Sequence, residues 1–182
     1  MRTLAITQNM TLDGSIEMPT DWFDPTVDDP GLREEMHLQD AAADALLVGR
    51  QTFVDFRGHW PAQENDTTGV TDYLNGVQKY VVSSTLTDPE WQNSTIVAGD
   101  PIAAVRELKQ QPGEDIVLTG SIRLGHALLE AGLVDELRLF VYPVVQGRGR
   151  GLFPDGREAT NVTLLQSRAF ESGVVLLRYA VG

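Results

Sequence analysis

Short apolar runs alternate with amphipathic segments along most of the 182-residue chain. The apolar runs, several of them rich in β-branched residues, predict strands over 2–8, 44–48, 79–86, 96–97, 116–118 and 135–141. Apolar residues at helical spacing predict helices over 31–43, directly after Gly49, over 101–111 and over 122–131. Two final strands, 162–170 and 174–181, are separated by three turn residues and predict a β-hairpin.

This alternation predicts an α/β fold in a single domain that spans 1–182. We expect a mostly parallel central sheet with flanking helices, the first strand at its centre and the C-terminal hairpin as an antiparallel end. Ligands of such sheets bind beyond the carboxyl ends of the strands. Gly49, Ser83 and Gly120 stand at three predicted strand ends, so they line one crevice if those strands are neighbours.

Three segments lack the pattern of a strand or a helix. Residues 18–31 contain several prolines and aspartates, with an apolar anchor in Trp22 and Phe23. Long loops in compact domains are functional lids or solvated insertions, and we favour a lid here. Residues 57–71 are expected to form a surface loop, and 143–153 a loop in which glycines alternate with arginines.

The segment 114–129 combines a strand, a tight turn and a helix start. Gly120 leaves room for a phosphate near the free backbone N–H groups of the helix, and Ser121 is the expected N-cap. The same pattern recurs where the strand 44–48 ends at Gly49. A single turn of this kind is equally an ordinary strand–helix connection, but two in one small chain favour a phosphate site.

Composition mainly excludes classes of protein. The net charge of −12 argues against a nucleic-acid surface, and no apolar run approaches the ~20 residues of a membrane helix. The absence of cysteine excludes disulfides and thiolate chemistry and, with no signal-peptide pattern at the start, predicts a cytoplasmic protein. His37, His59 and His126 are too scattered to predict a metal site. Because only two residues are lysines, a bound anion would meet arginine.

Five segments, in register over nearly the whole chain, resemble the dihydrofolate reductase-like family. They are 11–14 (TLDG), 44–52 (DALLVGRQT), 79–86 (KYVVSSTL), 120–121 (GS) with 128–136 (LLEAGLVDE), and 143–153 (PVVQGRGRGLF). The family is typified by the C-terminal reductase domain of the riboflavin-biosynthesis deaminase/reductase. The resemblance implies NADPH, hydride transfer to a small heterocycle or its open-chain imine, and a homodimer.

Carried over residue by residue, the family's site falls on four short segments. They are Asn9, Asp13 and Gly14 near the nicotinamide; Gly49, Arg50 and Thr52 at the cofactor phosphates; Ser83 and Ser84 beside the adenosine phosphate; and Thr119, Gly120, Ser121 and Ile122 at the pyrophosphate. The family more often has two consecutive glycines where this chain has Gly120 and Ser121. An arginine fork and two hydroxyls beside the ribose predict NADPH over NADH.

One departure limits the substrate. In true dihydrofolate reductases a helix carboxylate holds the pteridine, and the same spacing before Gly49 arrives near Arg33 in this chain. Glu34 and Glu35 are neighbours, but adjacent residues of a helix do not share a face. We therefore expect a reductase of a pyrimidine- or pteridine-like heterocycle, resembling 5-amino-6-(5-phosphoribosylamino)uracil reductase, rather than a dihydrofolate reductase. The alternative is a non-catalytic NADP(H)-binding dimeric scaffold that has lost its substrate site.

Three charged residues leave two interpretations open. Asp13 is the candidate catalytic residue, either orienting the substrate or relaying a proton, but Asp-Gly is also an ordinary turn. Arg148 and Arg150 form either an anion clamp for a substrate phosphate or the solvated side chains of a glycine-built turn, and we favour the turn.

Overall fold

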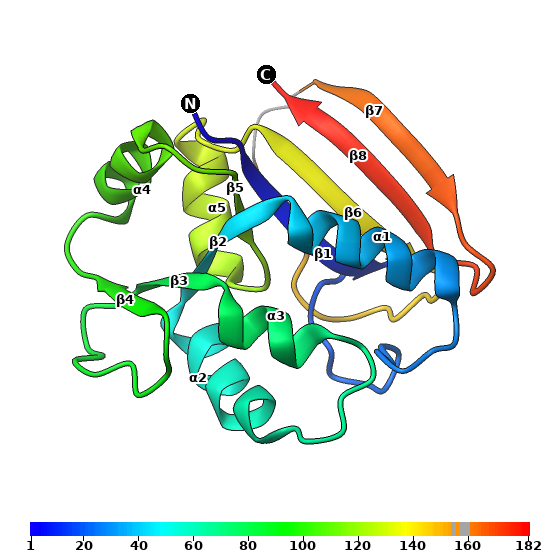
Figure 1. Ribbon diagram of the computed structural model, residues 1–182. Helices are drawn as coiled ribbons and strands as arrows, with labels where there is room; N and C mark the ends of the chain where they lie inside the picture. Colours follow the sequence, from blue (N-terminus) through cyan, green and yellow to red (C-terminus); the bar gives the residue numbers. More distant parts are fainter. Residues whose placement is uncertain (154–155, 157–160) are drawn as a thin grey trace.

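The computed structural model describes residues 1–153, 156 and 161–182, in which strands and helices alternate (Figure 1). In chain order the elements are β1 (Leu4–Thr11), α1 (Pro30–Ala41), β2 (Ala43–Gly49), α2 (Arg50–His59), the 3-10 helix η1 (Trp60–Ala62), α3 (Val70–Gly76), β3 (Gln78–Val82), β4 (Ser94–Val97), α4 (Pro101–Gln110), β5 (Asp115–Leu118), α5 (Ile122–Glu130), β6 (Glu136–Tyr142), β7 (Val162–Ala169) and β8 (Val175–Val181). Within these ranges no helix is long and apolar enough to cross a membrane.

The strands join one sheet in the order β4-β3-β2-β5-β1-β6-β8-β7. The neighbours from β4 to β6 are parallel, whereas β8 pairs antiparallel with both β6 and β7. The mostly parallel sheet, its central first strand and its antiparallel C-terminal hairpin are therefore confirmed. The order also places β3, β2 and β5 side by side, as the crevice at their ends requires.

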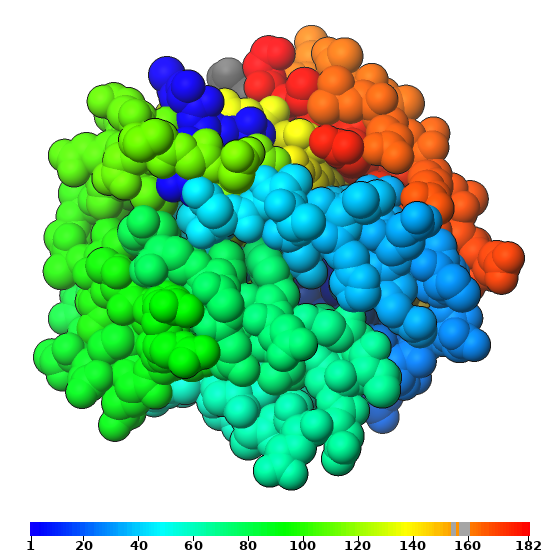
Figure 2. Space-filling model, in the orientation of Figure 1, coloured from blue at the N-terminus to red at the C-terminus, as the bar shows by residue number. Residues whose placement is uncertain are grey.

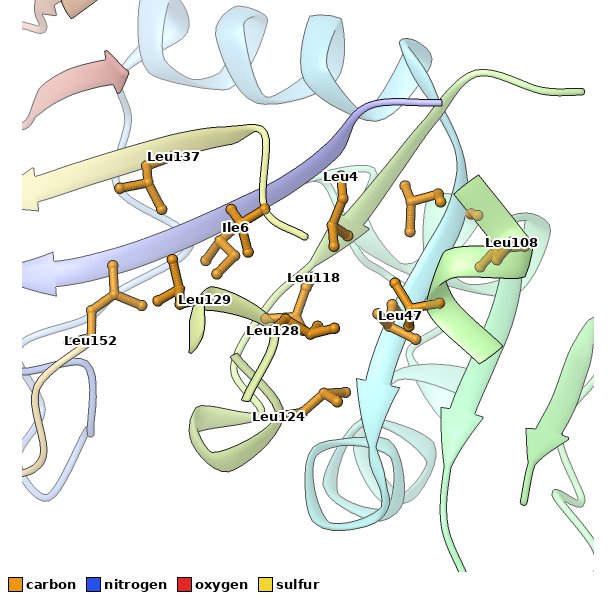
Figure 3. Close-up of a cluster of buried hydrophobic side chains, with 14 of the residues drawn as sticks. Leu4, Ile6, Leu47, Leu108, Leu118, Leu124, Leu128, Leu129, Leu137 and Leu152 are labelled. Atoms are coloured by element: carbon orange, nitrogen blue, oxygen red, sulfur yellow. The ribbon is translucent and has the colours of Figure 1, made fainter. Parts of the chain in front are cut away.

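Helices cover both faces of the sheet (Figure 1). Helices α4 and α5 pack on one face, where leucines from β1, β2, β5 and β6 meet them (Figure 3). Leu4, Leu118 and Leu128 in this cluster are fully buried, and each contributes about 1.5–3 kcal/mol to folding. Helices α2 and α3 pack on the opposite face beside β2 and β3, and α1 covers the part of that face near β6 and β8.

The alternation of side chains along a strand decides which residues face which layer. On β2, Leu47 belongs to the cluster under α4 and α5, whereas Leu46 belongs to the cluster under α2 and α3. On β1, the Ile6 side chain lies on the face covered by α5, so Thr7 and Asn9 lie on the opposite face, which α1 covers. Two polar side chains of the central strand are thereby directed between the sheet and α1.

Helix α1 is held at its N-terminus by a single carboxylate. Asp29 is the N-cap and accepts a hydrogen bond from the backbone N–H of Leu32 (3.0 Å), with Pro30 at the first helical position. Its second oxygen accepts from the backbone N–H of Ser172 (2.8 Å) in the turn between β7 and β8. The Asp29 cap therefore fixes both the residue at which α1 begins and the angle at which α1 crosses the sheet.

The expectation of a surface loop over 57–71 is wrong for both ends of that segment. Helix α2 continues to His59, η1 follows, and α3 begins at Val70. Asp66 starts α3 by accepting hydrogen bonds from the N–H groups of Thr68 and Thr71, both 2.8 Å. Glycine punctuation suggested a loop, but tertiary packing of Phe56, Trp60 and Val70 orders most of the segment.

Candidate cofactor and substrate site

The carboxyl ends of β2, β5 and β3 lie side by side, and they bring Gly49, Gly120 and Ser83 to one edge of the sheet. Gly49 is the last residue of β2, and α2 begins at the next residue. Leu118 ends β5 two residues before Gly120. The three strand ends are thus neighbours at the edge where parallel α/β sheets bind ligands, but Gly120 and Ser83 line two different hollows there and Gly49 lines neither.

The turn after β5 uses left-handed backbone at two successive residues. Gly120 has φ +57° and Ser121 has φ +50°. A Cβ on Gly120 would lie 3.1 Å from the Thr52 side chain, so glycine is needed there for space as well as for φ. A serine adopts this conformation less readily than a second glycine would.

The expected capping role of Ser121 is wrong. Ser121 occupies the N-cap position of α5, but its side chain caps no N–H of that helix. Its hydroxyl instead accepts a hydrogen bond from the backbone N–H of Gly49 (2.8 Å) and pairs with the Thr52 hydroxyl (3.0 Å). The left-handed backbone turns the side chain toward α2, so the serine joins the two predicted phosphate turns.

The first N–H groups of these turns already have protein acceptors. Gly120 N–H donates to Gln8 Oε1 and Ser121 N–H to Thr52 Oγ1, both at 3.0 Å. The donors that α5 can offer to an anion are therefore those of its first turn, beginning at Ile122 and Arg123, which have no partner four residues earlier within the helix. The bend at Gly120 and Ser121 therefore gives an anion access to the N–H groups of the first turn of α5, and not to those of the bend itself.

A hollow of about 390 Å³ lies beside the first turn of α2. It is lined by Arg50, Val82, Ser83, Ser84, Thr85, Val97 and Gly99. Arg50 is exposed, and among the described residues its guanidinium has no carboxylate partner. The Ser83 oxygen accepts from the N–H groups of Thr85 (3.2 Å) and Leu86 (2.9 Å), which leaves its hydroxyl proton to donate. The hollow therefore places the guanidinium of Arg50, which has no carboxylate partner among the described residues, beside hydroxyl donors.

A second, larger cavity of about 460 Å³ lies between the sheet and α1. Figure 2 shows an opening between α1 and the α2–α3 segment, with the dark blue of the N-terminal strand at its bottom. Most of its wall is apolar, with Phe23, Met36, Phe56, Trp60 and Phe140 contributing. Its volume lies within the roughly 300–1,000 Å³ of small-molecule pockets.

Four of the predicted site residues line this cavity. They are Asn9, Thr52, Thr119 and Gly120. Gln8, which the sequence did not single out, joins them and holds the Gly120 turn through its amide oxygen. The cavity therefore begins at the predicted cofactor turns and extends under α1.

The loop 18–31 forms part of the cavity wall, as a lid would. Met18, Phe23 and Val27 line the cavity, and Trp22 and Phe23 pack edge-on against Tyr142 with ring centroids 5.1 and 5.8 Å away. The aromatic anchor expected in this loop is confirmed, and its partner is the last residue of β6.

Asp13 and Gly14 lie at a tight turn that does not line the cavity. The Asp13 carboxylate accepts hydrogen bonds from the Thr11 hydroxyl (2.6 Å) and from the backbone N–H groups of Gln146 (3.1 Å) and Gly147 (2.6 Å). These donors lower its pKa to about 2, which keeps the group ionised. The catalytic role of Asp13 stays a prediction; the contacts give it the role of joining two loops.

The loop 143–153 is also joined to the segment that follows this turn, by an ion pair. Arg150 pairs with Glu17, its Nε donating to Oε1 (2.6 Å) and its backbone N–H to Oε2 (2.7 Å). Neither Arg148 nor Arg150 lines the two cavities described above. These contacts favour the interpretation of the segment as a glycine-built turn.

The cavity contains a carboxyl group that the sequence analysis missed. Asp40 lines it from the end of α1, and burial raises its pKa to about 6. Counting by the family's spacing led to Arg33, which lines the cavity two helical turns earlier. The sequence contained one feature that could have identified Asp40: the spacing of Arg33, His37 and Asp40 places three polar residues on one helix face. Among the described residues, no group of three or more histidine or acidic side chains could hold a metal ion.

Comparison with known proteins places these features in a family. The family model described as RibD C-terminal domain matches residues 2–176. The chain is 34% identical over 181 residues to an uncharacterized protein, YyaP, of Bacillus subtilis, covering 98% of this chain and 94% of that one.

Two solved structures share the fold at low identity. A putative riboflavin biosynthesis protein from Shewanella sp. PV-4 has a TM-score of 0.75 at 17% identity, covering 99% of each chain. A diaminohydroxyphosphoribosylaminopyrimidine deaminase/5-amino-6-(5-phosphoribosylamino)uracil reductase from Thermotoga maritima has a TM-score of 0.68 at 17% identity. The match covers 100% of this chain and 57% of the Thermotoga maritima chain.

Proposed function

The chain belongs to the family of the RibD C-terminal domain, and we propose that it is an NADPH-dependent reductase of a small pyrimidine- or pteridine-like heterocycle. The reductase named in the Thermotoga maritima protein suggests a substrate of the 5-amino-6-(5-phosphoribosylamino)uracil type. We expect no activity on dihydrofolate itself, because Arg33 stands where its carboxylate partner would be.

One observation carries the proposal: the predicted cofactor turns and a largely apolar cavity adjoin. Thr52, Thr119 and Gly120 belong both to the turns and to the cavity wall. A substrate in the cavity would lie next to a cofactor held by the turns, and hydride transfer needs the two reactants in contact. A scaffold that had lost its substrate site would have no need of such a cavity.

The side chains at the strand ends fit a phosphorylated dinucleotide. Arg50 would pair with the ribose 2′-phosphate, and Ser83 and Ser84 would donate hydroxyl hydrogen bonds to it. The first N–H groups of α5 would receive the pyrophosphate. When bound, NADPH supplies the hydride, which is chemistry that belongs to the cofactor.

The residues of the chain have the remaining tasks of orienting the substrate and excluding water. The loop 18–31 and the aromatic side chains of α2 and η1 would cover a flat ring in the cavity. Asn9 would fix the position of the reacting face from the sheet side, because it lies beside the predicted turn residues of the cavity wall. Asp13 would orient the substrate or relay a proton, and Gly14 would lie near the nicotinamide. Gly49 and Ile122 would belong to the turns that hold the cofactor phosphates.

Isothermal calorimetry with NADPH, followed by steady-state NADPH oxidation across reducible pyrimidines and pteridines, tests the proposal. We expect saturable 1:1 binding per chain and turnover with at least one heterocycle. Binding without turnover on every heterocycle would support the non-catalytic scaffold instead. No saturable binding of NADPH would overturn both alternatives.

Three further proposals follow from the family. We propose that the chain is one reductase domain over 1–182, that it forms a homodimer and that it acts in the cytoplasm. The homodimer is supported by edge strand β7, which exposes Val162, Leu164 and Leu165. We propose no nucleic-acid or membrane partner, because the surface charge is strongly acidic.

A further inference from the structure

Two parts of the chain face each other across the mouth of the larger cavity. Met36 and His37 of α1 line one side, and Trp60 and Thr68 of the segment 50–76 line the other. Figure 2 shows the opening between these two parts, with the N-terminal strand at its bottom. A ligand that enters through this opening must therefore pass between α1 and the residues that precede α3.

One hydrogen bond bridges this mouth. The His37 ring nitrogen Nε2 lies 2.7 Å from the carbonyl oxygen of Thr68, in the loop before α3. A carbonyl oxygen only accepts, so Nε2 carries a proton and the ring is the donor. His37 is exposed and yet lines the cavity, which places the bond at the rim. Among the described residues it is the one hydrogen bond that joins α1 to the segment 50–76.

The carbonyl that accepts this bond is held by its own loop. The Asp66 carboxylate accepts hydrogen bonds from the backbone N–H groups of Thr68 and Thr71, and the Thr68 hydroxyl also donates to it. The Thr68 hydroxyl oxygen in turn accepts from the N–H of Val70 (3.3 Å). These bonds restrain the loop, so the movable partner is the exposed imidazole of His37, which makes no other hydrogen bond among the described residues.

The residue after the acceptor leaves no room for a side chain beside the imidazole. Gly69 has φ +82°, and a Cβ on it would lie 2.9 Å from His37 Nε2. Glycine is therefore required by the close approach of the ring as well as by the left-handed backbone. A chance contact between two surface groups would not need a backbone shaped in this way.

We propose that the hydrogen bond between His37 and Thr68 is a latch on the mouth of the cavity. Ring-sized ligands enter or leave when this bond breaks and the imidazole moves into solvent. A hydrogen bond of ordinary net strength corresponds to a closed-to-open ratio of roughly two to ten, so the latch limits the rate of exchange without sealing the cavity. The inference rests on the proposed function only in taking the cavity as a ligand site, and it holds for any heterocycle.

Access to the cavity can be measured with a thiol. The chain has no cysteine, so one introduced thiol reacts without competition. Val117→Cys places it on the sheet side of the cavity, and Leu46→Cys, at the paired position of β2, is a second cavity position. Ala45→Cys places it in the core on the opposite face of the sheet. The rate at which N-ethylmaleimide, a small flat ring, modifies each protein is followed by intact mass. Opening of the mouth exposes the cavity thiols alone, whereas global unfolding exposes all three.

Adding His37→Ala to the Val117→Cys protein should raise the modification rate about threefold to tenfold, because the open form becomes dominant. His37→Gln should keep the rate within about twofold of the parent, since a glutamine amide can donate to the same carbonyl. Leu38→Ala is the control: this exposed neighbour on α1 lies outside the cavity, and its loss should leave the rate unchanged. None of these changes should alter the rate of the Ala45→Cys protein.

An unchanged rate with His37→Ala in both cavity positions would overturn the latch. A rise of equal size in the Ala45→Cys protein would overturn it too, because the change would then be global unfolding. A rise with His37→Gln as large as that with His37→Ala would overturn the role of the hydrogen bond. The assay contains neither cofactor nor substrate, so its outcome is separate from that of an NADPH titration. A latch in a protein that binds no NADPH would leave this inference standing and refute the proposed cofactor.

Discussion

Arg50 stands where an arginine is electrostatically unfavourable. It is the first residue of α2, so its charge adds to the partial positive charge of a helix N-terminus, and no carboxylate among the described residues offsets it. Such a position is explained by an anion that both the arginine and the helix bind. The neighbouring hydroxyls of Ser83 and Ser84 support the same explanation.

Replacing Arg50 with alanine should weaken NADPH binding by roughly 1.5–3 kcal/mol, the usual size of a charge-assisted bond, and leave NADH nearly unchanged. Calorimetric titration of both cofactors measures this difference. Arg106→Ala, an exposed change on α4, is the control and should alter neither affinity. Equal losses for NADPH and NADH would show that Arg50 does not contact the 2′-phosphate.

Asp40 provides a second prediction at the scale of one residue. Burial raises its folded-state pKa from 3.8 to about 6, so the folded chain favours the neutral carboxyl. The contribution of Asp40 to stability is therefore fully present below about pH 4 and is lost as the pH rises through about 6. Relative to Asp40→Asn, the wild type should lose about 1–3 kcal/mol of unfolding free energy between these limits.

Chemical denaturation of both proteins at about pH 4 and pH 7 measures this difference. The asparagine variant should be the more stable of the two at pH 7, since it carries no buried charge. A carboxylate kept at a cost in stability is characteristic of a functional position. If the two stabilities differ by the same amount at both pH values, Asp40 is not titrating in the folded protein.

At the scale of elements, the loops 11–17 and 143–151 behave as one unit. Asp13 joins them through two hydrogen bonds, which it accepts from the backbone N–H groups of Gln146 and Gly147. Glu17 and Arg150 join them again, and Ser15 pairs with Gly151 in an antiparallel bridge. The exposed Asp13 carboxylate is held by the Thr11 hydroxyl and two backbone N–H donors rather than by burial. The motif 11–14 and the glycine–arginine segment are thus partners in the fold, although they stand far apart in the sequence.

Asp13→Ala should accelerate amide hydrogen exchange at Gln146 and Gly147, because both N–H groups lose their acceptor. Asp88→Ala, a change in a separate exposed turn, is the control. Native-state exchange followed by NMR gives the rates. If exchange is unchanged while kcat falls steeply, the residue acts in catalysis and the joining role is wrong.

At the scale of the whole molecule, the sheet has an exposed edge. Strand β7 is the outermost strand beside β8, and a bulge between Leu164 and Gln166 places the two adjacent residues Leu164 and Leu165 at the surface, 53% and 54% exposed. Most edge strands are protected by charged side chains or by a helix or loop that covers them, so an edge strand with exposed leucines indicates a protein contact.

We expect sedimentation equilibrium to give the mass of a homodimer. Changing Leu164 and Leu165 together to glutamate should convert it to a monomer, because two buried charges without partners would destabilise the interface. Val145→Glu is the control, since Val145 is 72% exposed but lies on a loop. A wild-type monomer at tens of micromolar would contradict the homodimer, and a dimeric double variant would place the interface elsewhere.

The order of strands and helices could be predicted from the sequence because it depends on local repeats. Short apolar runs rich in β-branched residues identified the strands, and apolar spacing near 3.6 residues identified most helices. The βα order then predicted a parallel sheet. The crevice followed as well, since the carboxyl ends of parallel strands meet at one edge. The sequence by itself placed Gly49, Ser83 and Gly120 at strand ends, and the strand order of the structure decided that those strands are neighbours.

The helix α3 and the orientation of Ser121 could not be predicted from local patterns. Helix α3 is seven residues long and begins at a residue that follows a left-handed glycine, so packing against the sheet rather than propensity determines it. Ser121 has the residue type of an N-cap, yet its left-handed backbone directs the hydroxyl to another turn. In both cases contacts with distant residues decided between local alternatives.

The burial of the Asp40 carboxyl group in the cavity was decided by the tertiary structure. Asp40 is one of 26 acidic residues, and its helical spacing from Arg33 and His37 is the one signal in the neighbouring sequence that distinguishes it. Its pKa is raised by burial because α1, α3 and β1 all contribute to the wall of one cavity. Periodic patterns record which face of an element is buried, but burial of a single charged side chain depends on what the other elements place around it.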